Sequence, residues 1–232
     1  MIRPTRHDIF ASIIFLLICA LLIFAGWMVM RVYRTLPARV DFDKYPVKGI
    51  DISAHNGEID FDRVREAGYS FVWVKASEGE TFRDSRFAAN IEAADSAGLR
   101  TGAYHYFRFD CDGLLQAMNL TQALDGRMPP MGIAIDVEEE GNATGIPTDV
   151  IVARLGVMLD YLNLRGYPVT LYSNKDGYYE YLAEEFSDYP LWICSFTNDN
   201  PIEDAPQWTF WQYSHSGRVP GIEGKVDENI LR

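Results

Sequence analysis

The chain has 232 residues, of which 48% are hydrophobic, 13% aromatic and 23% charged, and these proportions fit one folded domain with a substantial core. The charge is uneven, because residues 47–232 hold 15 Lys and Arg against 30 Asp and Glu. This acidic excess argues against a nucleic acid partner, since phosphates are bound by basic side chains. Three cysteines are too few for a disulfide-stabilised scaffold.

The first predicted element is a membrane-spanning helix over residues 9–30, which follows a tail of residues 1–8. The run contains no charged residue, and at about 1.5 Å per residue its 22 residues match the roughly 30 Å hydrocarbon core of a bilayer. It is longer than the apolar part of a cleaved signal peptide, and no small-x-small cleavage site follows it. We therefore expect an uncleaved single-pass anchor in a lipid bilayer.

The flanking charges leave the orientation of this anchor open. Two arginines precede the run and three follow it, which does not favour a cytoplasmic amino terminus. The orientation must therefore be inferred from the chemistry of the following domain. Residues 31–46 include two prolines and predict a short linker.

From residue 47 onward, short apolar strands alternate with amphipathic helices. The first five predicted strands cover residues 47–53, 70–76, 99–107, 131–137 and 168–173. The helices that follow them cover residues 61–67, 85–97, 113–124, 148–165 and 177–186. Three further strands, at residues 191–196, 208–213 and 226–230, have no helices between them. The pattern predicts an α/β fold: a modified TIM-like barrel of five βα units and three helix-poor strands over residues 47–232.

Four acidic residues lie at strand ends, where parallel α/β folds place their reactive groups. Asp51 is near the end of the first strand, and Asp227 is in the last. Asp136 and Glu138 close the fourth strand, and their spacing of two points both side chains to the same face. Asp136 directly follows the apolar run Ile133–Ile135, so a surface position fits it poorly.

Paired carboxyl groups suit the hydrolysis of a glycosidic bond. This reaction needs a protonated carboxyl that donates to the leaving oxygen and a partner that stabilises the oxocarbenium-like centre. Crowding two acids drives their pKa values apart and supplies both forms. A metal centre is the rival interpretation of clustered acids, but the histidines lack the close spacing of metal ligands, so we expect no metal and no cofactor.

A series of motifs extends this interpretation over the whole domain. In chain order they are GIDIS at 49–53, KASEG at 75–79, GAYHYF at 102–107, IDVEEEG at 135–141, LYSN at 171–174, LWI at 191–193 and FWQYS…G…GIEGKVDENI at 210–230. In this order the motifs resemble glycoside hydrolase family 25, the lysozymes of the Chalaropsis type that cleave bacterial peptidoglycan. The family's fold is a modified barrel of five βα units and three further strands, as the pattern of elements also predicts.

The resemblance assigns roles to the acidic residues. Glu138 matches the family's general acid, and Asp51, Asp136 and Asp227 match the acids around the cleaved bond. Asp136 would either stabilise the reactive centre or orient the acetamido group of the substrate, because a carboxylate nucleophile and participation by the substrate's own N-acetyl group both remain open.

The matching motifs also contain candidate residues for binding sugars. Rings near strand ends can stack on pyranose faces, although aromatic side chains also fill cores. The aromatic candidates are Tyr104, Tyr106, Tyr172, Trp192 and Trp211. Lys75 and Glu78 are also candidates for substrate binding, and the two are expected to form an ion pair. His105 is expected to be structural because it alternates away from the neighbouring tyrosines. A disulfide between Cys111 and Cys194 stays an open alternative.

The sequence therefore predicts a monomeric N-acetylmuramidase that cleaves β-1,4 bonds between N-acetylmuramic acid and N-acetylglucosamine in peptidoglycan. The anchor would hold it in the cytoplasmic membrane of a bacterium, with the catalytic domain on the extracytoplasmic side. Two alternatives remain: a non-catalytic peptidoglycan-binding protein on the same barrel, and a glycosidase acting on chitin-like glycans.

Overall fold

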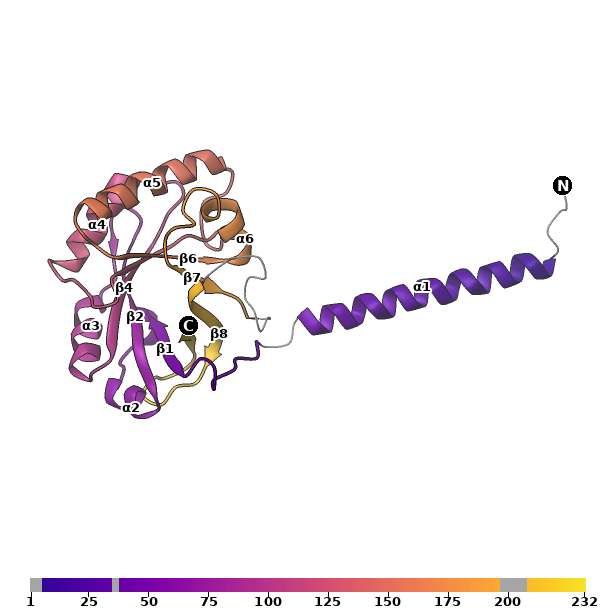
Figure 1. Cartoon of the computed structure of the whole chain (residues 1–232), viewed down its shortest axis with the longest axis horizontal. Coiled ribbons are helices and arrows are strands. Elements are labelled where there is room, and N and C mark those ends of the chain that lie inside the picture. Colours follow the sequence, from indigo (N-terminus) through magenta and orange to yellow (C-terminus); the bar gives the residue numbers. More distant parts are fainter. Residues whose placement is uncertain (1–5, 35–37, 197–207) are drawn as a thin grey trace. The chain divides into compact units, whose positions relative to one another are not determined.

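The structure is a computed structural model that describes residues 6–34, 38–196 and 208–232. Within the first of these segments, side chains are described for residues 14–29. The chain divides into two compact units, Met1–Pro37 and Ala38–Arg232. The described part of the first unit is one helix, and every described strand belongs to the second, which is called the barrel unit below (Figure 1).

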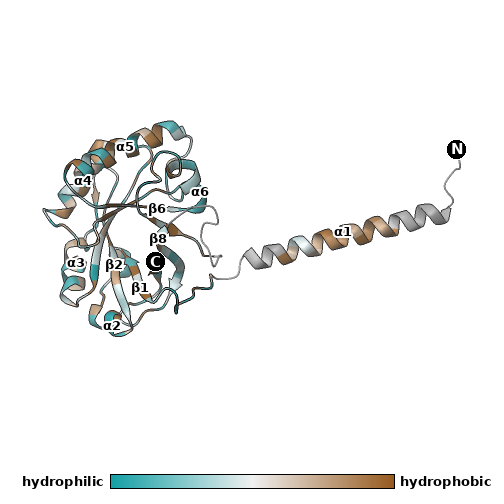
Figure 2. Ribbon diagram, in the orientation of Figure 1, coloured by the Kyte–Doolittle hydropathy of each residue, from teal (hydrophilic) through white to brown (hydrophobic). Residues whose placement is uncertain are grey.

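Helix α1 (Arg6–Arg34) covers the apolar run of the sequence. Its described apolar side chains are exposed, with 66% of Phe15, 70% of Leu21 and 73% of Ile23 accessible. In the ribbon of Figure 2, the middle of the helix has the colour of hydrophobic residues. Among the residues described, no helix is both long and apolar enough to cross a membrane. The span expected over residues 9–30 is therefore not confirmed, and the side chains of residues 9–13 and 30 lie outside the described set.

In its described residues, the barrel unit contains nine strands and the helices that connect them. The strands are β1 (Val47–Ile52), β2 (Tyr69–Glu78), β3 (Phe82–Arg83), β4 (Arg100–Tyr106), β5 (Ile133–Asp136), β6 (Val169–Asn174), β7 (Leu191–Cys194), β8 (Trp208–Gly217) and β9 (Val226–Leu231). The helices are η1 (Ala54–Asn56), α2 (Phe61–Glu66), α3 (Phe87–Ser96), α4 (Gly113–Leu124), α5 (Thr148–Leu164), α6 (Lys175–Gly177) and η2 (Tyr178–Leu182). Helices α2, α3, α4 and α5 lie outside the ring of strands (Figure 1).

Eight of these strands close into a barrel. The strand order is β1-β9-β8-β7-β6-β5-β4-β2-β3, and pairing of β1 with β2 closes the ring and leaves β3 as a hairpin extension of β2. Neighbouring strands from β1 through β2 and β4 to β8 are parallel, whereas β9 is antiparallel to both β8 and β1. The predicted barrel of five βα units and three helix-poor strands is confirmed.

Large aromatic side chains fill the barrel interior. Trp73 and Trp192 stack with ring centroids 5.3 Å apart, and Phe71 and Phe210 pack beside them. Glycines on the adjacent strands make this possible. A Cβ atom at Gly49 would lie 2.2 Å from the Phe71 ring, and one at Gly102 would lie 2.3 Å from the Trp73 ring. This aromatic layer forms a floor inside the barrel.

The segment from Ala38 to Pro46, predicted as the second half of a linker, belongs to the barrel unit. Ala38 N–H donates to Phe196 O at 2.6 Å, and the Tyr45 ring lies 5.2 Å from that of Trp208. The Phe42 ring lies 5.9 Å from that of Tyr213. The segment therefore covers part of the barrel wall built from the helix-poor strands, and we call residues 38–46 the strap.

The helix predicted over residues 177–186 differs from the structure. Asn174 Oδ1 accepts from Gly177 N–H at 2.8 Å, so the first turn begins at Lys175. A wider π-helical turn, η2, then buries both Tyr178 and Tyr181. The short hairpin strand β3 also has no counterpart in the prediction, because two residues carry no detectable alternation.

Candidate active site

A cavity of about 200 Å³ opens at the carboxyl ends of the parallel strands. It gathers residues from eight strands of the barrel and the loop after β5. The residues that line it are Asp51, Lys75, Tyr104, Tyr106, Asp136, Glu138, Tyr172, Trp192, Gln212 and Asp227. All four acids predicted from the sequence therefore meet in one place, together with four of the five aromatic candidates.

Strand register explains how the acids meet. Asp136 is the last residue of β5, and Glu138 follows two residues later, while Val137 between them is fully buried in the core outside the barrel. Asp51 in β1 is paired with Asp227 in β9. The alternation of side chains along an extended chain thus places Asp136 and Glu138 in the same cavity.

Two side-chain amides hold Asp51. Its Oδ2 atom accepts hydrogen bonds from Gln212 Nε2 at 2.9 Å and from Asn229 Nδ2 at 2.8 Å. Gln212 Nε2 also lies 3.4 Å from Asp227 Oδ2, and Gln212 Oε1 accepts from the Tyr172 hydroxyl at 2.9 Å. Burial and the nearby charge of Asp227 raise the pKa of Asp51 to about 7, although the two amides act in the opposite direction.

Asp136 is buried and lacks a full set of partners. Its Oδ1 atom has no hydrogen-bond partner among the described residues. Burial raises the pKa of Asp136 well above its usual value, and the charge of Glu138 adds to this effect while Lys75 opposes it. A buried carboxyl without donors favours its neutral form.

Glu138 and Asp227 are also poised to hold protons near neutral pH. Burial, with the charges of Glu140 and Asp51, raises the pKa of Glu138 to about 7, while Lys75 opposes the shift. Burial and the charge of Glu138 raise the pKa of Asp227 to about 6. Interacting carboxyls of this kind supply a protonated and an ionised group in one site.

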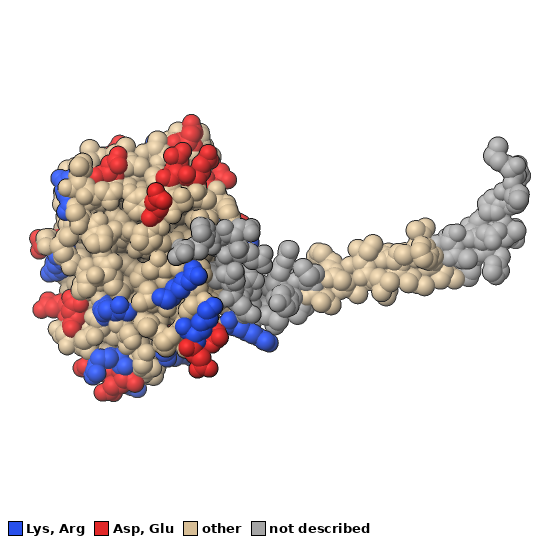
Figure 3. All heavy atoms as spheres, viewed as in Figure 1, with Lys and Arg blue, Asp and Glu red and all other residues tan. Residues whose placement is uncertain are grey.

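Basic side chains at the rim limit the negative charge. Lys75 Nζ donates to Glu78 Oε2 at 2.8 Å, which agrees with the expected pair, and lies 5.3 Å from the centre of the Tyr106 ring. Arg108 lies 3.6 Å from the other oxygen of Glu78. Glu78 itself does not line the cavity but orients the lysine that does. On the barrel face shown in Figure 3, basic and acidic side chains are likewise both present.

The aromatic candidates separate into two groups. Tyr104, Tyr106, Tyr172 and Trp192 line the cavity, and the Trp192 indole N–H donates to Asn229 Oδ1 at 2.8 Å. Trp211 does not reach it. This side chain is fully buried in the core outside the barrel, and its indole N–H donates to Ser195 O at 2.8 Å. Its neighbours in β8 on either side face the interior, so alternation turns Trp211 outward.

The loop that carries Glu138 is fastened by Asn142. Its Nδ2 atom donates to Glu138 O at 2.9 Å and to Phe107 O at 2.8 Å, and its Oδ1 accepts from Phe109 N–H at 2.8 Å. Sequence reasoning missed Asn142, Gln212 and Asn229. Asn229 carried a signal, because it lies within a motif two residues from Asp227. Gln212 lies in a motif as well, but it is adjacent to Trp211, and alternation from that candidate would turn Gln212 away from the site.

The histidine and the two cysteines singled out in the sequence do not form a second site. His105 is buried outside the cavity between Ser77 and Gln116, and burial lowers its pKa to about 4, which agrees with the predicted structural role. Cys111 and Cys194 are free thiols rather than a disulfide. Within the described segments, no group of three or more His, Cys, Asp or Glu is arranged to hold a metal ion.

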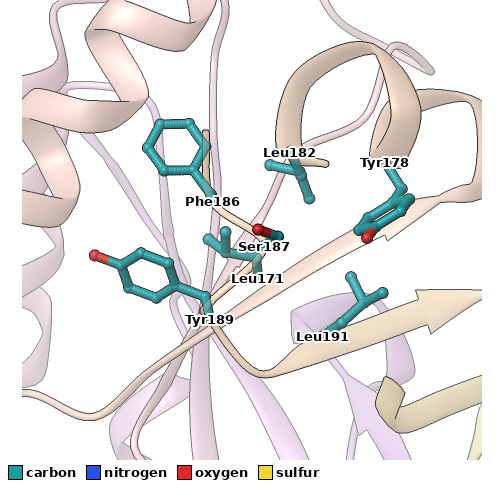
Figure 4. Close-up of a pocket in the computed structure, with 7 residues that line it drawn as sticks. All are labelled: Leu171, Tyr178, Leu182, Phe186, Ser187, Tyr189 and Leu191. Atoms are coloured by element: carbon teal, nitrogen blue, oxygen red, sulfur yellow. The ribbon is translucent and has the colours of Figure 1, made fainter. Parts of the chain in front are cut away.

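A second cavity, of about 110 Å³, lies between η2 and strands β6 and β7 (Figure 4). Its described lining contains Leu171, Leu191 and the rings of Tyr178 and Phe186, and no carboxylate. Hydrolysis by acid catalysis therefore has no donor there.

Comparisons with known proteins agree with this geometry. The sequence profile described as Glycosyl hydrolases family 25 matches residues 50–222. The chain is 36% identical over 181 residues to the autolytic lysozyme of Clostridium acetobutylicum, an alignment that covers 78% of this chain and 54% of that protein. It is 32% identical over 203 residues to lysozyme M1 of Streptomyces globisporus, which covers 81% of this chain and 68% of that protein.

Solved structures give the same result. A family 25 glycosyl hydrolase from Bacillus anthracis has a TM-score of 0.76 and 29% identity, and the match covers 85% of this chain and 93% of that one. The bacterial lysozyme from Streptomyces coelicolor has a TM-score of 0.70 and 29% identity, with 80% and 92% covered.

Proposed function

The chain belongs to the glycosyl hydrolases of family 25 and is a peptidoglycan hydrolase of the lysozyme type, and on this basis we propose that it cleaves the β-1,4 bond between N-acetylmuramic acid and N-acetylglucosamine with Glu138 as the proton donor. The observation that carries this proposal is that four carboxyl groups line the same cavity at the mouth of the barrel.

Glu138 has the properties that a general acid needs. Its side chain lines the cavity, and its raised pKa of about 7 keeps it protonated in mildly acidic solution. Protonation of the leaving oxygen by a positioned acid contributes typically 10²–10⁴ in rate. Glu139, next along the chain, is a poor candidate because its carboxylate accepts from the Tyr181 hydroxyl at 2.7 Å, away from the cavity.

Asp136 is assigned to the reacting centre. Its carboxyl lines the cavity, where it can accept a hydrogen bond from the substrate's acetamido N–H or stabilise positive charge at the anomeric carbon. Both a carboxylate nucleophile and participation of the N-acetyl group are compatible with this position. Asp51 and Asp227 supply the remaining negative charge around the cleaved bond.

The rings of Tyr104, Tyr106, Tyr172 and Trp192 are assigned to sugar binding. They line the same cavity as the acids, where apolar ring faces can pack against pyranose rings. Lys75, held by Glu78, would contact polar groups of the glycan. No metal ion or cofactor is required for this chemistry.

We also propose that α1 holds the enzyme at the cytoplasmic membrane of a bacterium, with the barrel unit on the extracytoplasmic side as a monomer. The uncharged run of residues 9–30 and the exposed apolar side chains of α1 support this proposal. A tagged full-length chain should stay in the membrane fraction after alkaline extraction, and a reporter fused after Arg232 should be active only in its exported form. Release by alkali, or a reporter active only in the cytoplasm, would contradict the proposal.

Product analysis tests the enzymatic proposal most directly. The full chain is incubated with purified peptidoglycan and, separately, with chitin, and the new reducing ends are identified by mass spectrometry after borohydride reduction. Reduced N-acetylmuramic acid ends from peptidoglycan are the expected result. New ends from chitin alone would favour a chitin-like substrate, and binding without new ends would favour a non-catalytic role.

A further inference from the structure

The carboxyl groups of Asp51 and Glu138 differ in how many hydrogen-bond donors they receive. Asp51 Oδ2 receives two N–H donors, from Gln212 and Asn229. Among the residues that the structure describes, no side chain or backbone group donates to the carboxyl of Glu138. Donors stabilise the ionised form of a carboxyl, so the two acids are prepared for different charge states.

We propose that Gln212 and Asn229 are positioning residues that offset the effect of burial and of Asp227 on Asp51, so that Asp51 ionises before Glu138 and the transferable proton stays on Glu138. This inference rests on the proposed function, because it requires Glu138 to be the proton donor. Neither amide is proposed to touch the substrate.

The orientation of the Asn229 amide follows from its partners. The indole N–H of Trp192 can only donate, and it lies 2.8 Å from Asn229 Oδ1. The amide oxygen is therefore turned to Trp192, and the NH₂ group is turned to Asp51. Asn229 is fully buried, so no alternative donor from bulk water replaces it.

Gln212 is fixed in a similar way. Its NH₂ group lies within 3.4 Å of carboxylate oxygens on both Asp51 and Asp227, and its oxygen accepts from the Tyr172 hydroxyl. The reverse orientation would bring the amide oxygen against two carboxylates, which is unfavourable. Because both amides occupy Oδ2, a proton on Asp51 is restricted to Oδ1.

The other charged groups around Glu138 do not replace this arrangement. Lys75 from β2 favours ionisation of Glu138, and Glu140 on the same loop opposes it. Asp136 from β5 is buried and lacks a partner on Oδ1. Asp227 from β9 has one long contact with Gln212 and a side-chain hydrogen bond with Asp51, which lowers the pKa of Asp227 and raises that of Asp51, against the effect of the two amides. The cavity tyrosines and Cys194 from β7 stay neutral near pH 7, since burial raises their pKa values. Asp51 is thus the acid with the most donors.

Two isosteric variants test the proposal in the full chain in detergent. Gln212→Met and Asn229→Leu each remove one donor and keep the side-chain volume nearly constant. Asp51 should then hold its proton to higher pH, and Glu138, with one fewer negative neighbour, should lose its proton more easily. We expect the basic limb of kcat/KM against pH to move down by about one unit in each variant.

Gln116→Met is the matched control. Gln116 is a buried glutamine outside the cavity that bonds to His105 and Arg108. Its loss should lower the thermal stability without moving the basic limb. A folded Gln212→Met or Asn229→Leu enzyme whose basic limb coincides with that of the wild type overturns the proposal.

Two further measurements separate the possible failures. If Glu138→Gln keeps wild-type activity, the donor assignment itself is wrong, whereas an inactive Glu138→Gln with an unmoved limb in the amide variants refutes only the positioning role. Carboxyl ¹³C titration of the wild type, assigned with Asp51→Asn and Glu138→Gln, decides the matter even if the amide variants do not fold. Asp51 should ionise at a lower pH than Glu138, and the opposite order contradicts the proposal.

Discussion

Asp51 and Asp227 lie opposite each other on β1 and β9. Among the described strands of the barrel, β9 is antiparallel to both of its neighbours, whereas the other neighbouring strands, apart from the hairpin strand β3, are parallel. Asp51 is near the end of its strand, whereas Asp227 is near the start of its own. The reversed direction of β9 therefore brings the beginning of a strand to the mouth of the barrel, where parallel strands present their ends. Close approach of the two acids follows from this topology and contributes to the raised pKa of Asp51.

The raised pKa values predict a bell-shaped dependence of activity on pH. Glu138 must be protonated, and its pKa of about 7 places the loss of activity above neutral pH. The acid limb reports the ionised partners, of which Asp227 has a pKa of about 6. We expect the kcat/KM of soluble peptidoglycan fragments to be greatest between these values, and to fall about tenfold per unit on the basic side.

The same profile is measured with EDTA as a control, because a site of carboxyl groups alone needs no metal. The two curves should coincide. Activity that is lost in chelator and restored by zinc or magnesium would contradict the proposed chemistry, as would a rate that still rises above about pH 9.

A pair of neighbouring glutamates offers a matched test of the proton donor. Glu138→Gln keeps the shape of the side chain but cannot protonate the leaving oxygen, so activity should fall by roughly 10²–10⁴ with glycan binding retained. Glu139→Gln is the control, since Glu139 points to Tyr181 and not into the cavity. Equal losses in both variants would indicate damage to the loop and not removal of the acid.

The positions of the catalytic acids could be predicted because they depend on local rules. Strand and helix alternation predicts the parallel barrel, and a spacing of two predicts that Asp136 and Glu138 project together. The same rules fail for Trp211. Strand β8 is apolar on both faces, so its residue pattern cannot tell which of Phe210 and Trp211 faces the interior.

The remaining differences arise from long-range packing. The amides of Gln212 and Asn229 reach Asp51 across 161 and 178 residues of sequence, and no local pattern connects them. The strap likewise includes one of the two prolines of the predicted linker, but its rings find partners on β8 only once the barrel has closed. Tertiary contacts, and not propensity, decide the structure of residues 38–46.

Asp136→Asn should make the enzyme more stable and less active. The folded-state pKa of Asp136 lies above its unfolded value. Between these two pKa values the folded state binds more protons than the unfolded state. The wild type therefore loses stability as the pH rises through this range. Asparagine avoids this loss. We expect a higher Tm than that of the wild type at pH 8, and a smaller increase near pH 4.

Calorimetry at the two pH values checks this prediction. A gain that is the same at both would mean that the charge of Asp136 is not its source. Activity within a few-fold of the wild type would separately remove Asp136 from the reacting centre, since an amide can neither act as an anion nor stabilise positive charge as well.

The strap predicts a stability effect that is separate from catalysis. Tyr45 is half-buried and packs its ring against Trp208 at 5.2 Å. Tyr45→Ala should lower the free energy of unfolding by about 1–3 kcal/mol, from lost apolar burial and a lost ring contact. Leu164→Ala, at a side chain that is 86% exposed, is the control and should change it by less than about 0.5 kcal/mol. Denaturant unfolding of the full chain measures both.

Catalysis should be insensitive to the same change. The strap residues do not line the cavity, so the kcat/KM of folded Tyr45→Ala should remain close to that of the wild type. If Tyr45→Ala unfolds with the stability of the wild type, the contact with Trp208 contributes nothing, and residues 38–46 act as the linker that their composition suggests. If activity falls while stability holds, the strap instead influences the site through β8, whose Gln212 contacts Asp51.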